Sequence, residues 1–189
     1  MRAEHSCFGF AAPRADGLFF ALLPDIAAAA QLERTAQQLG IRHRLNGAPL
    51  ASERFHISLL GFGSHAGVPP ELVAAASKIA AEVAGRPFEV TFDRAVSFLG
   101  RPRPLVLCGE AGVADLIAFR RMLGDAIQTR GLGRVKPQYT PHITLLYDQR
   151  GIEEHAIEPV SWTVREFVLV HSVRGQSRYV PLGCWPLRG

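Results

Sequence analysis

Two histidines of this chain lie in matching short motifs, one in each half of the sequence. The first motif is His56-Ile-Ser58-Leu and the second is His142-Ile-Thr144-Leu. Each motif lies in an alternating apolar and polar stretch that is typical of a β-strand, where side chains two positions apart lie about 7 Å from each other on one face. Each strand is therefore expected to present an imidazole and a hydroxyl group side by side.

These four polar groups suit in-line displacement at phosphorus. One neutral imidazole can take a proton from an attacking water molecule, and an imidazolium can give a proton to the departing ribose oxygen. The two hydroxyl groups can hold the non-bridging phosphate oxygens. Histidine's ordinary pKa of about 6.5 makes both protonation states available near neutral pH.

Two other interpretations of the motif histidines fit the pattern less well. Either histidine taken alone fits a half-buried strand residue that is hydrogen-bonded to its neighbours, but a matched pair is less easily explained in this way. A metal site is disfavoured, because the motifs supply no pair of histidines four residues apart and no adjacent carboxylate. We therefore predict that no metal and no cofactor is needed.

The rest of the chain alternates between helix-like and strand-like segments. Helices are predicted from the capping residue Asp25 to about residue 39, where Gly40 ends the helix, from Pro69-Pro70 to about residue 84, and over 113–129. Strands are predicted over residues 17–23, 55–59, 88–99, 105–108, 141–147, 162–173 and 178–185, with a turn centred on Gly175. Tyr147 is expected to share a face with Ile143 and Leu145, opposite His142 and Thr144.

The order of these segments favours an α+β fold. The two β-like runs within residues 88–108 are expected to pair as antiparallel neighbours, and so are the two runs within residues 162–185. This pairing argues against a doubly wound parallel sheet. A length of 189 residues with 48% hydrophobic and 20% charged side chains suits one compact domain or two closely packed lobes. No linker, repeat or low-complexity tract interrupts the sequence, so residues 1–189 are predicted to form a single domain.

Composition also limits where the protein acts. No apolar run reaches the roughly 20 residues that cross a bilayer, and the N-terminus does not have the layout of a signal peptide, so we expect no membrane contact and a cytoplasmic location. Three widely spaced cysteines are expected to be reduced thiols. The formal net charge of +4 permits an anionic ligand without establishing a nucleic-acid-binding protein.

The two motifs resemble the twin signatures of the 2H phosphoesterase superfamily, specifically its LigT-like branch, which is also called the 2′-5′ RNA ligase family. The likeness covers most of the chain: residues 17–24 are similar to the family's opening strand, Thr140-Pro-His142 to its approach to the second motif, and residues 172–187 to its closing hairpin. The resemblance implies a bilobal α+β fold, in which two pseudo-symmetric lobes with antiparallel sheets flank a central cleft.

The resemblance further implies hydrolysis of a 2′,3′-cyclic phosphate on RNA 3′ ends or on cyclic nucleotides, leaving a 2′-phosphate, by a monomer. Carried over from the family, His56 is the general acid, His142 is the general base, and Ser58 and Thr144 bind phosphate. The same histidines would serve 2′-5′ oligonucleotide cleavage, hydrolysis of ADP-ribose cyclic phosphate or 2′-5′ ligation. A non-catalytic RNA- or nucleotide-binding module is the alternative from another functional class.

One position departs from the family pattern. Bacterial relatives often carry an arginine five residues after the second histidine, and this chain has Tyr147 there. Arg54, Arg150 and Arg174 are candidates for the missing cation. Tyr139 and Tyr179 could stack on a base. The predicted substrate-binding residues are Tyr139, Tyr147, Arg174 and Tyr179, whereas the histidines outside the motifs are expected to be surface or structural residues: His43, His65, His155 and His171.

Overall fold

The computed structural model describes residues 16–173, 175–176 and 178–188, which form two lobes, each built on a four-stranded antiparallel sheet. In the first sheet the order is β2-β1-β7-β8. Its strands are β1 (Asp16–Leu22), β2 (Ile57–His65), β7 (Glu166–Val173) and β8 (Arg178–Pro186). In the second sheet the order is β5-β4-β3-β6, with β3 (Phe88–Ser97), β4 (Arg103–Cys108), β5 (His142–Asp148) and β6 (His155–Val164).

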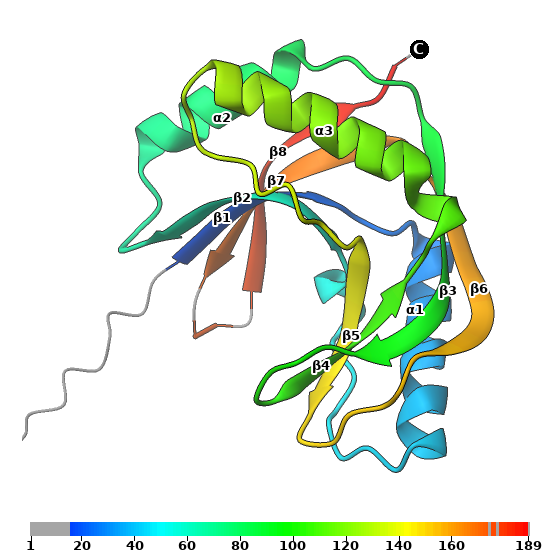
Figure 1. The fold of residues 1–189 in the computed structure, drawn as a ribbon. Helices are drawn as coiled ribbons and strands as arrows, with labels where there is room; N and C mark the ends of the chain where they lie inside the picture. Colours follow the sequence, from blue (N-terminus) through cyan, green and yellow to red (C-terminus); the bar gives the residue numbers. More distant parts are fainter. Residues whose placement is uncertain (1–15, 174, 177, 189) are drawn as a thin grey trace, which may run out of the picture.

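The helices cover the outer faces of the two sheets. Helices α2 (Pro70–Glu82) and α3 (Ala114–Thr129) lie over the first sheet, and α1 (Ile26–Arg42) lies along the outer side of the second (Figure 1). The motif strands β2 and β5 are both edge strands, and they contact each other between the lobes. The predicted α+β fold with two lobes is confirmed. No described helix is long and apolar enough to span a membrane.

Several predicted element boundaries were wrong. The helix capped by Asp25 continues past Gly40 to Arg42, because buried Leu32, Ala36 and Leu39 hold it against the core despite the cost of about 1 kcal/mol for a glycine in a helix. The chain leaves the helix beyond His43, at Arg44, which has a φ of 53°.

The strand predicted over 162–173 is two strands in different sheets. β6 pairs with β3, and β7 pairs with β1, so the chain crosses between the lobes at Arg165. The start of β6 was missed, because residues 155–161 include Pro159 and several polar residues, a composition that indicates a loop. Similarly, β2 extends to His65, well beyond the predicted end at Leu59.

A β-bulge lies at the same position of both motifs. In β2, Ser58 pairs with Ala21 and Leu60 pairs with Phe20, which leaves Leu59 as the extra residue. In β5, Thr144 pairs with Val106 and Leu146 pairs with Leu105, which leaves Leu145 as the extra residue. The bulge lets the consecutive leucines of each strand, 59–60 and 145–146, all enter the core.

The bulge in β5 is held by the segment that follows α1. The backbone N–H of Leu50 donates to the carbonyl oxygen of Leu145 at 2.8 Å. At the end of the strand, the buried carboxylate of Asp148 accepts hydrogen bonds from the backbone N–H groups of Asn46, Gly47 and Arg150, at 2.5, 2.6 and 2.7 Å. These bonds lower the pKa of Asp148, the bonds from Arg150 and Gly47 having the largest effect.

The bulge in β2 is held by α3 and by the loop that follows it. Arg120 donates from Nε to the carbonyl oxygen of Leu59 at 3.0 Å and from Nη2 to that of Lys136 at 3.0 Å. Its guanidinium also lies over the ring of Tyr139, at 4.1 Å from the centroid, and the Tyr139 hydroxyl donates to the carbonyl oxygen of Ser58 at 2.9 Å. Each motif strand is thus fixed at its bulge by a segment from outside its own sheet.

We predict that Asp148→Asn lowers the melting temperature by several degrees at neutral pH, because an amide cannot accept all three N–H bonds without turning its own NH₂ toward a donor. A folded-state pKa below the unfolded value of about 3.9 means that the stabilisation is present above that pH and is lost as the pH falls through the folded pKa. Thermal unfolding followed by circular dichroism should therefore show the two proteins converging in acid. An equal difference at every pH would contradict this role for the carboxylate.

Candidate active site

The two motif histidines are oriented in the same way. His56 donates from Nδ1 to the carbonyl oxygen of Arg54 at 2.8 Å, and His142 donates from Nδ1 to that of Thr140 at 2.7 Å. A carbonyl oxygen can only accept, so these bonds fix the proton on Nδ1 and leave Nε2 to exchange protons. His155 makes the same kind of local bond, so this bond alone does not identify a catalytic histidine.

The edge positions of β2 and β5 distinguish the motif histidines from His155. These two strands contact each other between the lobes, and each motif lies at the start of its strand. The histidines are close enough for the charge of His142 to act on His56. The structure thus brings together the two imidazoles that the sequence places 86 positions apart.

The hydroxyl groups lie next to the histidines as the alternation predicts. The Ser58 hydroxyl is exposed and donates to Nε2 of neutral His56, with 3.1 Å between Oγ and Nε2. Thr144 is half-buried and shares a face of β5 with half-buried His142. Each lobe therefore contributes one imidazole and one hydroxyl group.

The pKa of His56 is lowered, mainly because burial penalises the charged imidazolium. The nearby charges of His142 and Arg54 lower it further, and the bond from Nδ1 to the Arg54 carbonyl opposes the shift. In the unliganded protein the neutral form of His56 is therefore favoured at neutral pH. Any anion that binds beside His56 will favour the protonated form.

Aromatic rings lie beside both histidines. The His56 ring lies 5.2 Å from the ring of Phe19 and 5.0 Å, edge to face, from that of Tyr179. The guanidinium of Arg54 lies over the ring of Tyr179, 5.3 Å from its centroid. In the second lobe, the His142 ring lies 5.1 Å from Phe98. Phe19 and Phe98 were not singled out from the sequence, since only tertiary contacts bring them to the histidines.

The three tyrosines that were predicted to bind substrate have different surroundings in the structure. Tyr179 contacts His56. Tyr147 is 45% exposed, and because it pairs with Pro104 while Thr144 pairs with Val106, it lies on the face that carries Thr144. The prediction that Tyr147 shares a face with Ile143 was wrong, since the bulge at Leu145 reverses the alternation.

Tyr139 is placed differently from the other two tyrosines. Its hydroxyl is bound to the Ser58 carbonyl oxygen and its ring is covered by Arg120. Burial raises the pKa of its phenol. This residue supports β2 through a bond to the backbone of the motif.

The candidate cations also differ in their surroundings. Arg150 donates to the Arg44 carbonyl oxygen at 2.9 Å and so helps to close the loop beside β5. Arg174 lies outside the described residues. Arg54 is close enough to His56 to lower its pKa, and its buried Nε has no hydrogen-bond partner in the described part of the chain.

A further arginine lies on the same face of the second sheet as His142. Arg94, Cys108 and His142 pair in one row across β3, β4 and β5. The Arg94 guanidinium is bound by Glu154 at 3.0 Å and Glu110 at 3.4 Å, so its charge is already balanced. Burial raises the pKa of the Cys108 thiol to about 11, which keeps it protonated and inert.

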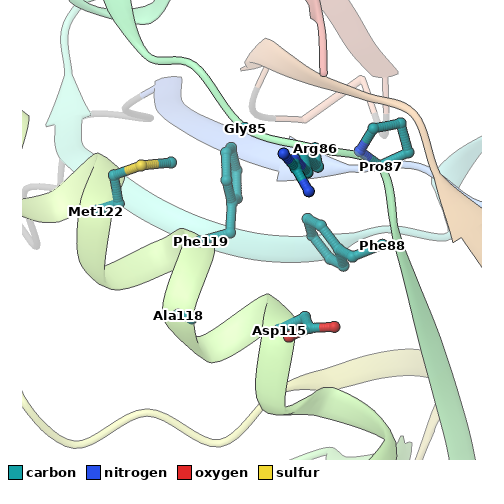
Figure 2. Close-up of a pocket in the computed structure, with 8 residues that line it drawn as sticks. All are labelled: Gly85, Arg86, Pro87, Phe88, Asp115, Ala118, Phe119 and Met122. Atoms are coloured by element: carbon teal, nitrogen blue, oxygen red, sulfur yellow. The ribbon is translucent and has the colours of Figure 1, made fainter. Parts of the chain in front are cut away.

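A separate pocket lies away from both motifs. It has a volume of about 410 Å³ and opens between α3 and the segment before β3, where Figure 2 shows Phe88, Phe119 and Met122 around it. None of the motif residues lines it. Among the described residues, no three histidine, cysteine or acidic side chains gather as a metal site would require.

Comparison with known proteins identifies the family. Residues 24–176 match the model of the 2′-5′ RNA ligase superfamily. Escherichia coli LigT in its apo form is 30% identical, with a TM-score of 0.69 over 93% of this chain and 99% of that one, and LigT complexed with 3′-AMP is 29% identical, with a TM-score of 0.70 over the same shares. A Thermus thermophilus protein is 21% identical, with a TM-score of 0.74 over 92% of this chain and 98% of that one, and supports the fold alone.

No curated protein sequence gives a significant match. The family match spans most of the chain and includes both histidine motifs, and the LigT structures share its two-lobed architecture. The chain therefore belongs to the 2′-5′ RNA ligase superfamily, among the LigT-like 2H phosphoesterases.

Proposed function

We propose that this protein is an enzyme that hydrolyses 2′,3′-cyclic phosphates on RNA 3′ ends or on nucleotides, giving a 2′-phosphate without a metal ion. The observation that carries the proposal is the matched orientation of His56 and His142. Both imidazoles are fixed through Nδ1. His56 directly precedes β2 and His142 begins β5, and these two edge strands contact each other between the lobes. This arrangement supplies two Nε2 atoms, one for each proton transfer of the reaction.

In the proposed reaction, Nε2 of His142 takes a proton from water as the water oxygen bonds to phosphorus. The bond from phosphorus to O3′ breaks, and O3′ receives the Nε2 proton of His56. Ser58 and Thr144 donate their hydroxyl protons to the non-bridging oxygens. Ser58 already bonds His56 at 3.1 Å, so a short rotation would exchange the imidazole for a phosphate oxygen.

Arg54 is the best-placed cation for the phosphate. Its guanidinium lies over the ring of Tyr179, which contacts His56, and its terminal N–H groups could donate to a phosphate oxygen there. The same phosphate charge would raise the pKa of His56 toward the protonated form that a general acid needs. Substrate binding thus prepares His56 for its role, which the unliganded site does not favour.

Nucleotide ligands of LigT support a nucleotide substrate. Solved LigT structures contain 3′-AMP, NADP⁺, ATP and phosphate. In this chain, Tyr179 and Phe19 beside His56 provide aromatic surface on which a base can stack. The 2′-5′ phosphodiesterase or ligase reaction fits the family equally well, and product analysis on 2′-5′-linked oligonucleotides would distinguish it.

We predict that His56→Ala and His142→Ala each reduce turnover of a 2′,3′-cyclic nucleotide by at least about 100-fold, since each removes a general acid or base. Turnover should be measured by chromatographic analysis of the nucleotide product, with excess EDTA present, and EDTA should leave the wild-type rate unchanged. His65→Ala, which removes an imidazole bonded to the Phe62 carbonyl oxygen, is the matched control. Near-normal activity in either motif variant would rule out the mechanism.

The pH profile should identify which histidine is the acid. For wild type, kcat/KM, which reports the free enzyme, should fall on both sides of an optimum, because one imidazole must be protonated and the other neutral. The lowered pKa of His56 moves the limb that its titration controls to lower pH. If His56 is the acid, the residual rate of His142→Ala should fall only as the pH rises, and that of His56→Ala should fall only as the pH is lowered. The opposite result would mean that the roles are exchanged.

Tyr139 should act by positioning β2, with no part in base stacking. Tyr139→Phe keeps the ring but removes the bond to the Ser58 carbonyl oxygen, a loss of about 0.5–1.5 kcal/mol that we expect to lower kcat by about threefold to tenfold. KM should not change. If Tyr139→Phe leaves kcat and KM unchanged while Tyr139→Leu raises KM, the ring of Tyr139 stacks on a base.

A further inference from the structure

A second pocket lies directly beside the support for β2, outside the set of residues that the proposed reaction uses. It has a volume of about 300 Å³ and is formed by one face of α3 together with the loop that leads from α3 into β5, drawn in yellow-green in Figure 1. Its lining residues are Ile117, Arg120, Arg121, Asp125, Gln128, Val135, Lys136, Pro137 and Tyr139.

The charge of this pocket favours an anion. Three cations line it, Arg120, Arg121 and Lys136, against the single carboxylate of Asp125. Arg120 is occupied, since its guanidinium bonds two carbonyl oxygens and covers the Tyr139 ring. Arg121 and Lys136 are exposed, and neither forms an ion pair with a carboxylate in the described ranges. These two side chains are therefore available to a ligand.

The pocket adjoins the active site through the backbone that carries the motifs. Tyr139 lines the pocket with its ring and bonds the Ser58 carbonyl oxygen with its hydroxyl. The next residue of the loop, Thr140, holds Nδ1 of His142. Tyr139 and Thr140 thus join the pocket to the segments that hold both motif histidines.

The geometry points to a binding site for the phosphodiester backbone of the RNA strand, upstream of the cyclic phosphate. This inference rests on the proposed function and narrows its substrate class to polynucleotide ends in preference to free mononucleotides. Exposed lysine and arginine side chains bind successive phosphates of a single strand chiefly through charge, without reading the sequence. Affinity for the strand should accordingly depend on salt.

The test compares two substrates with the same reacting group, a mononucleoside 2′,3′-cyclic phosphate and a short oligoribonucleotide that ends in one. The double variant Arg121→Gln, Lys136→Gln should raise KM for the oligoribonucleotide by about tenfold, with kcat unchanged, and should leave both constants for the mononucleotide unaltered. The control double variant Arg34→Gln, Lys78→Gln removes one cation from α1 and one from α2, and it should leave KM and kcat unchanged for both substrates. For the Arg121, Lys136 double variant acting on the oligoribonucleotide, the slope of log KM against log salt concentration should fall by about 1.4, or about 0.7 for each lost contact.

A direct binding measurement tests this inference independently of the proposed reaction. Fluorescence anisotropy of a labelled oligoribonucleotide should show about tenfold weaker binding to the Arg121, Lys136 double variant than to wild type or to the control variant. Equal affinity of all three proteins would overturn the inference, whether or not the enzyme hydrolyses cyclic phosphates. An equal rise in KM for both substrates would also overturn it, because the pocket would then act on the catalytic site itself.

Discussion

The structure depends on two β-bulges, one at the same position of each motif strand. An edge strand presents backbone groups that no neighbouring strand satisfies, and here the carbonyl oxygens of Leu59 and Leu145 accept hydrogen bonds from Arg120 and from the backbone of Leu50. The bulge also buries two consecutive leucines in each strand, which fixes the register. Both imidazoles are thereby presented from strands that cannot slide.

The electrostatics of the site follow from this constraint. Strands that are fixed at the junction of the lobes hold His56 near His142 and Arg54 in a partly buried setting, and burial together with like charge lowers the pKa of His56. Such a site gains a proton most readily when an anion arrives. In the proposed reaction, binding of the phosphate would therefore also prepare His56 for proton transfer. The inferred strand-binding pocket adjoins the loop that supports both motifs.

Much of the fold and of the candidate site could be predicted from the sequence, because the relevant signals are local. The alternation around the two motifs predicted strands with an imidazole and a hydroxyl group on one face, and the capping residue Asp25 marked the start of α1, where its side chain accepts from the Ala28 N–H at 2.8 Å. The paired β-runs correctly indicated antiparallel sheets. The family resemblance carried by the two motifs also implied two related lobes.

By itself, then, the sequence determined the fold class, the motif residues and the family resemblance, since periodicity and residue type act over a few positions. Only the tertiary structure decided that Tyr147 lies on the face of Thr144, that Tyr139 supports β2, and that residues 155–173 divide between two sheets. Each of these depends on a contact between distant segments: a bulge set by core packing, a bond from a loop to an edge strand, and a crossing between lobes. Such contacts leave no periodic signal, because the partner that decides each outcome lies far away in the chain.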